Sequence, residues 1–69
     1  MNRGQYMRAA RKKRGLSLRK LSELSGYHAN TIFHLENNTR HGNIDTITDL
    51  ADALGISIDE YVGHKRKGE

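Results

Sequence analysis

The sequence predicts an all-α domain in which five short helices form one compact bundle. The chain has 69 residues and no cysteine or proline, so it must build a single small core without disulfides. Glycines divide it into intervals that each suit one short helix. Within these intervals apolar residues recur every three or four positions, as they do on one face of a helix.

The first two helices are predicted from glycine stops and a polar N-cap. The first runs from about Gly4 to Arg14, where Gly15 tolerates the left-handed conformation that ends a helix. The second begins at Ser17, a residue type that caps helix N-termini, and stops before Gly26. The predicted inward-facing residues are Met7, Ala10, Leu18, Leu21 and Leu24.

Three more helices follow. The third is expected from about His28 to Asn37, and the fourth begins at the N-cap Asn43. The capping-box pair Ser57 and Glu60 opens a short fifth helix. The domain is predicted to span residues 1–62, followed by a basic, disordered tail at 63–69. The predicted inward-facing residues of the third and fourth helices are Ile32 and Leu35, then Ile44, Ile47, Leu50, Ala51 and Leu54; the short fifth helix carries Ile58, Tyr61 and Val62.

Charge is divided sharply along the chain. Residues 1–20 hold eight Lys or Arg and no acid, whereas residues 21–62 hold seven acids and one Arg, in a chain of net charge +4. A basic run is often only a solvated helix face, but this division favours a polyanion held on one side of the domain. Arg19 and Lys20 lie in the first turn of a helix, where the dipole disfavours cations and an external phosphate would offset the cost.

The segments GLSLRKLSELSGYHANTIFHLEN and IDTITDLADALGISIDEYV resemble the lambda-repressor-like family of DNA-binding domains, which includes Cro, phage repressors and xenobiotic-response-element proteins. The resemblance covers roughly Met7 to Val62. It implies a helix-turn-helix whose second helix enters the major groove of a palindromic operator as part of a homodimer. The chain departs from the family pattern at the recognition-helix cap, at the third residue after Ser17 and in the loop that usually holds proline; these departures are His28, Lys20 and Gly42.

The resemblance also assigns base-contacting positions. They fall on Ala29, Asn30 and His34. An asparagine can pair with adenine, an alanine can touch a thymine methyl, and a histidine could donate to guanine N7 or O6. Asn30 could instead cap its own helix, and Ala29 could serve helix propensity alone. The role of Phe33 stays open between a methyl contact and packing on the first helix.

Contacts to the DNA backbone are expected around these positions. At Arg40 a minor-groove contact and a solvated side chain are alternatives. The expected backbone-contacting residues are Leu18, Arg19, His28, Thr31, Asn37, Asn38 and Arg40.

The resemblance further implies a buried ion pair between Arg11 and Glu36, with an exposed pair of little energetic value as the alternative. Ile58, Tyr61 and Val62 are expected either to form a dimer interface or to close the core.

Other classes of function receive less support. The four histidines are irregularly spaced and lack cysteine or clustered carboxylates, so neither a metal site nor another cofactor is expected. No catalytic motif is present, and the chain is expected not to be an enzyme. No apolar run suits a membrane span, which predicts a soluble, cytoplasmic protein. The resemblance implies a bacterial or phage-encoded transcriptional regulator, either Cro-like or a restriction-modification controller. An antitoxin or another protein-interaction module of the same fold is the alternative, and an exposed apolar patch would favour it.

Overall fold

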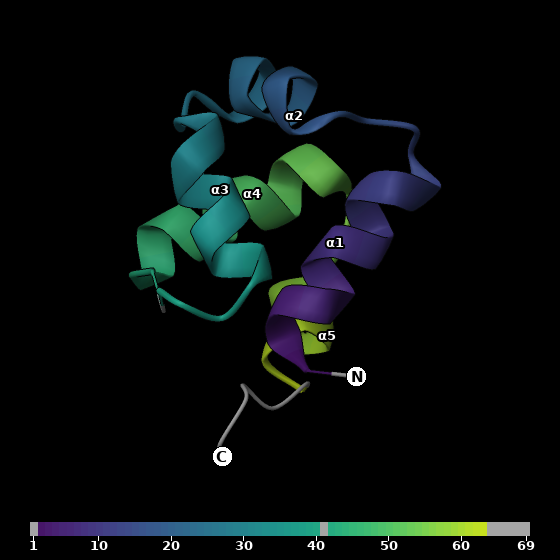
Figure 1. Ribbon diagram of the computed structural model, residues 1–69. Coiled ribbons are helices and arrows are strands. Elements are labelled where there is room, and N and C mark those ends of the chain that lie inside the picture. Colours follow the sequence, from purple (N-terminus) through teal and green to yellow (C-terminus); the bar gives the residue numbers. More distant parts are fainter. Residues whose placement is uncertain (1, 41, 64–69) are drawn as a thin grey trace.

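The computed structural model describes residues 2–40 and 42–63, and within them it contains five α-helices and no strand (Figure 1). The all-α, five-helix prediction is therefore confirmed. The helices are α1 (Arg3–Lys13), α2 (Leu18–Ser25), α3 (Ala29–Glu36), α4 (Ile44–Leu54) and α5 (Ile58–Val62). Apart from Gly63, the predicted tail lies outside the described residues.

Side-chain caps fix where most of these helices begin. Ser17, Asn43 and Ser57 each accept a hydrogen bond from a backbone N–H of the first turn, as the sequence predicted. Helix α1 begins one residue earlier than expected because Asn2 caps it, in a capping box completed by Gln5. The boundaries therefore follow from local polar chemistry.

The core collects buried side chains from every helix. Two residues that were predicted to face inward do not: Leu24 is 56% exposed, and Ile44 is 66% exposed. A step of three residues rotates about 60° short of a full turn, so a spacing of three drifts around the helix. Leu21 lies at the centre of the buried stripe, and Leu24 has left it. The core consists of Met7, Leu21, Ile32, Leu35, Ile47, Leu50, Leu54 and Tyr61.

The packing leaves one face of α3 open to solvent. Helix α3 packs against α1 on one side and α2 on another, while α4 lies behind it and contacts α2 (Figure 1). Helix α5 fills the remaining space between α1 and α4. In the described part of the chain, every helix is too short and too polar to cross a membrane.

Candidate nucleic-acid interface

The turn between α2 and α3 is held from both sides. Gly26 takes the left-handed conformation, with φ of 81°, and the hydroxyl of Ser22 donates to the carbonyl oxygen of Tyr27. The phenol of Tyr27 donates to Asp49 Oδ2 at 2.6 Å, which ties the turn to α4. This hydrogen bond to a carboxylate raises the pKa of Tyr27 above its ordinary value. The entry to α3 is thus fixed from outside the helix.

The N-terminal end of α3 keeps its polar groups available. His28 occupies the N-cap in an extended conformation but makes no side-chain capping bond. Asn30 is exposed, and its side chain has no hydrogen-bond partner among the described residues, so it does not cap its own helix. Ala29 and Thr31 are half-buried beside it. The amide of Asn30 and the first N–H groups of the helix can therefore meet an external partner.

The C-terminal end of α3 is closed by a Schellman motif. Asn38 takes the left-handed conformation, with φ of 61°, and its N–H donates to the carbonyl oxygen of Leu35 at 3.2 Å. The N–H of Thr39 donates to the carbonyl oxygen of His34 at 2.9 Å. The hydroxyl of Thr39 also contacts the ring of His34, with 2.8 Å between Oγ1 and Nδ1. The chain reversal thus uses the carbonyls that a helix end leaves free.

Asn38 makes long-range contacts that sequence reasoning did not anticipate. Its Oδ1 accepts the N–H of Gly4 at 3.2 Å, and its Nδ2 donates to Oδ1 of Asn2 at 2.9 Å. A Cβ on Gly4 would lie 2.7 Å from the carbonyl oxygen of Leu35, so only glycine lets α1 approach so closely. The side chain of Asn38, expected at the DNA backbone, is instead engaged with the first turn of α1.

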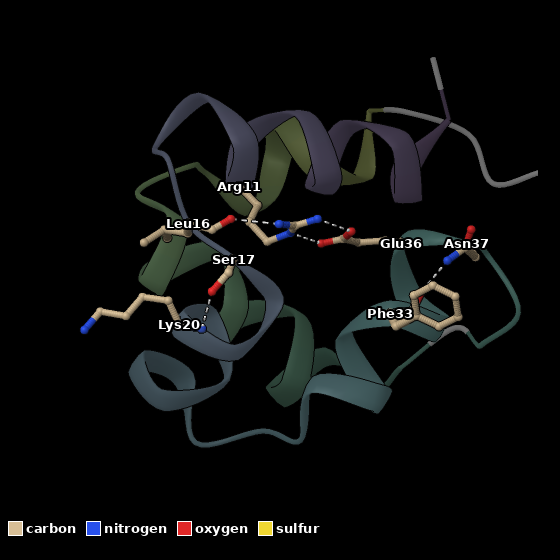
Figure 2. A network of polar contacts seen from close by, with 7 residues as sticks. All are labelled: Arg11, Leu16, Ser17, Lys20, Phe33, Glu36 and Asn37. Carbon is tan, nitrogen blue, oxygen red and sulfur yellow. Dashed lines mark hydrogen bonds and ion pairs between the residues drawn. The ribbon is translucent and has the colours of Figure 1, made fainter.

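The expected ion pair joins α1 to the end of α3 (Figure 2). Arg11 Nε donates to Glu36 Oε2 at 2.7 Å, and Arg11 Nη2 donates to Oε1 at 3.1 Å. The side chains are 10% and 3% exposed, so the pair is buried. Arg11 Nη1 donates to the carbonyl oxygen of Leu16 at 2.7 Å. The guanidinium therefore fixes α1, the loop before α2 and α3 together.

Phe33 lies at the junction of three helices. It is 47% exposed, and its ring meets that of His34 edge to face with centroids 5.6 Å apart. Together with Arg8, Leu18 and Asn37 it lines a hollow of about 120 Å³. The Asn37 side chain donates to the Phe33 carbonyl oxygen at 2.8 Å (Figure 2). Phe33 thus lies at the flank of α1, and Arg8 adds an exposed cation that the sequence reasoning did not single out.

The start of α2 presents N–H groups and cations to solvent. Ser17 Oγ accepts the N–H of Lys20 at 3.0 Å, which leaves the earlier first-turn N–H groups of Leu18 and Arg19 without this cap (Figure 2). Arg19 and Lys20 are exposed, and so is Arg40 beyond the C-terminal end of α3. Exposed cations at the start of α2 and after α3, together with an outer face of α3 that has no charged residue, suit a polyanion.

Helix α5 divides its apolar residues between core and surface. Tyr61 is 5% exposed and belongs to the core, which is the second of the two alternatives that the sequence left open for this side chain. Its hydrophobic ring closes the end of the bundle, while Ile58 is half-buried and Val62 is 44% exposed. Val62 and Ile44 line one hollow of about 200 Å³.

Among the described residues no group of three or more potential metal ligands occurs.

Comparisons with known proteins agree with this arrangement. Residues 7–61 match the model of the helix-turn-helix family HTH_3. The P22 c2 repressor, determined in complex with a synthetic operator, superposes with a TM-score of 0.84 at 26% identity, covering 100% of this chain and 98% of that one. SinR, a master regulator of biofilm formation determined in complex with DNA, superposes with a TM-score of 0.81 at 24% identity, over 87% and 97% of the two chains. No functionally curated protein matches the chain.

Proposed function

The chain belongs to the lambda-repressor-like helix-turn-helix family of DNA-binding transcriptional regulators, and we propose that it reads a specific operator with α3 in the major groove. The observation that carries this proposal is the outer face at the start of α3. It is uncharged, and its Asn30 amide has no hydrogen-bond partner among the described residues, while exposed cations lie at the start of α2 (Arg19 and Lys20) and beyond the C-terminal end of α3 (Arg40). Base edges are read by such hydrogen-bonding groups, whereas cations meet phosphates.

Asn30 and Ala29 are the proposed reading residues at the N-terminal end of α3. An asparagine amide matches the N6 and N7 pattern of adenine, and an alanine methyl suits the methyl of thymine. His34 lies one turn later, on the same side of the helix. The geometry of this helix therefore allows contacts with neighbouring base pairs.

The phosphate contacts are proposed at both sides of the groove. The N–H groups of Leu18 and Arg19 at the start of α2 form one donor set, with the exposed Arg19 side chain beside them. Asn37 and Arg40, both exposed after α3, form the other. The P22 c2 repressor, which has the same fold and was solved with a synthetic operator, supports this orientation by analogy.

We further propose a homodimer on a palindromic operator, joined through an apolar patch that consists of Ile44 and Val62. Both side chains are exposed, and they border a hollow that Ile47 and Tyr61 also line. A second copy could seat these residues in the same hollow by two-fold symmetry. Two modules on adjacent half-sites would bind more tightly than one because the second contact is intramolecular.

The same patch is the observation that keeps a protein-interaction role, such as that of an antitoxin, as a second candidate. An exposed apolar surface suits a foreign partner as well as a second copy. Sedimentation of the protein at increasing concentration separates the two. If the wild type forms a dimer and Val62→Lys does not, the result supports a homodimer on a palindromic operator. If the wild type is strictly monomeric and the patch stays exposed, the result favours a different protein partner.

The proposed reading function is tested by selection from a random-sequence duplex pool. The wild-type protein is expected to enrich a palindrome, and Asn30→Ala is expected to lose the preference at one position of each half-site. Glu23→Ala, which changes an exposed residue of α2, serves as the control and should enrich the same sequence. Retention of DNA without any enriched sequence would contradict specific reading.

A further inference from the structure

The ring of His34 is held in a short hydrogen-bond circuit with Thr39. Nδ1 of His34 lies 2.8 Å from Oγ1 of Thr39, and the same Oγ1 lies 3.1 Å from the carbonyl oxygen of His34. The backbone of Thr39 is fixed because its N–H donates to that carbonyl in the Schellman motif. The circuit is thus a consequence of how α3 ends.

A count of the protons in this circuit assigns the tautomer of His34. A threonine hydroxyl has one proton, and a carbonyl oxygen can only accept. The contact between Oγ1 and the carbonyl therefore uses the hydroxyl proton, and the contact between Oγ1 and the ring requires a proton on Nδ1. If the hydroxyl donated to Nδ1 instead, Oγ1 and the carbonyl oxygen would face each other with no proton between them. In the neutral ring Nε2 then carries the lone pair.

We infer that His34 presents a hydrogen-bond acceptor to DNA and reads an exocyclic amino group, adenine N6 or cytosine N4. This inference rests on the proposed insertion of α3 into the major groove. In that groove adenine and cytosine offer amino donors, whereas guanine offers N7 and O6, which are both acceptors. A guanine opposite Nε2 would set one lone pair against another. The residue type alone suggested a donor to guanine, and the Thr39 circuit reverses that role.

Thr39 is therefore a positioning residue that acts on DNA through His34. Replacing it with valine keeps the shape of the side chain but removes the hydroxyl. The ring of His34 is then free to carry its proton on Nε2 and to donate to guanine. Thr48→Val is the matched control, because Thr48 is an exposed threonine on α4, outside the circuit.

The tautomer can be measured without DNA. Long-range ¹H–¹⁵N spectra of the free protein at pH 8, where free histidine is neutral, distinguish the two neutral tautomers, and His34→Ala identifies the resonance. The wild type and Thr48→Val should show the Nδ1–H form of His34, and Thr39→Val should show a shift toward Nε2–H. A wild-type ring that is mainly Nε2–H would overturn the inference, whatever the protein binds.

The base preference is measured on the selected operator. The position that loses its preference in His34→Ala should hold adenine or cytosine, and guanine there should weaken wild-type binding roughly tenfold, as expected for one mismatched hydrogen bond. In Thr39→Val this discrimination should shrink to about two- or threefold. A wild-type preference for guanine would overturn the reading role. A wild type with no sequence preference, but with the Nδ1–H ring, would instead overturn the proposed function and leave the tautomer intact.

Discussion

The two ends of the recognition helix α3 are built in opposite ways. At its N-terminal end His28 makes no side-chain cap, and among the described residues nothing engages the Asn30 side chain. At its C-terminal end Glu36 is paired with Arg11, and Asn38 is bonded to Gly4. The C-terminal end of α3 thus contributes to stability, while the polar groups at its N-terminal end remain available for the proposed contact with DNA. Substitutions at the two ends should therefore separate stability from recognition.

The largest effect on stability is expected from the buried ion pair. Glu36→Ala leaves the Arg11 guanidinium buried without its carboxylate, and breaking such a pair costs roughly 3–5 kcal/mol. In a domain of this size each kcal/mol lowers the melting temperature by about 4–8 °C. Thermal unfolding should show this loss, whereas Glu23→Ala at an exposed site should melt almost as the wild type. An unchanged melting temperature for Glu36→Ala would contradict the stabilising role assigned to the Arg11–Glu36 ion pair.

Asn38 should have the next largest effect on stability. Asn38→Ala loses both side-chain bonds to the first turn of α1 and places a less tolerant residue at positive φ, a combined cost of about 2–3 kcal/mol. Asn38→Gly keeps the left-handed backbone and should lose only about 1 kcal/mol. Urea denaturation of both variants measures the difference. If both unfold at the wild-type midpoint, the contact between α1 and the end of α3 does not stabilise the protein.

At the other end of α3, Asn30→Ala should change recognition without lowering stability. The residue is exposed and unpaired among the described residues, and alanine has the higher helix propensity. Loss of a bidentate base contact should weaken specific binding by roughly 1–3 kcal/mol. Fluorescence anisotropy on the selected operator, together with a melting curve, tests both halves of this expectation. A marked loss of stability would show that the N-terminal end is structural as well.

The smallest effect is a pH dependence at the turn before α3. The Asp49 carboxylate raises the pKa of Tyr27, so the stabilisation from this phenol is fully present below its unfolded value of 10.0 and is lost as the pH rises through the higher folded value. Stability measured between pH 8 and about 10.5 should fall less steeply in Tyr27→Phe than in the wild type. Tyr6, which Glu60 affects in the same direction, contributes to both curves. Equal slopes would contradict a role for Tyr27.

Local chemistry explains which structural features the sequence could predict. The caps Ser17, Asn43 and Ser57 were predictable because each bonds to an N–H within its own first turn. The Asn2–Gln5 capping box follows the same local rule with asparagine and glutamine, although it was not among the predicted caps. Gly26 was predictable as the end of the second helix because glycine, which lacks a Cβ, tolerates the positive φ that this position adopts.

Long-range geometry explains the rest. The bond from Asn38 to Gly4 joins residues 34 positions apart, and no local pattern indicates it. Ile44 fits the apolar spacing of its helix, but it begins that helix at the edge of the bundle, where no neighbour covers it fully. Tyr61 was ambiguous between core and interface because a five-residue helix has too few residues to define a buried face. The Arg11–Glu36 pair was expected from a family resemblance and not from spacing.

The proposed division of roles is that the start of α3 reads bases while the exposed cations at the start of α2 and after α3 hold phosphates. Its most direct test is the salt dependence of binding by Asn30→Ala and Arg19→Ala, each measured on the selected operator and on a scrambled duplex. Arg19→Ala should weaken both duplexes alike and reduce the slope of log K against log salt by about 1, whereas Asn30→Ala should keep the slope and lose most of the preference for the operator. Identical losses of slope and preference in the two variants would contradict this division of roles.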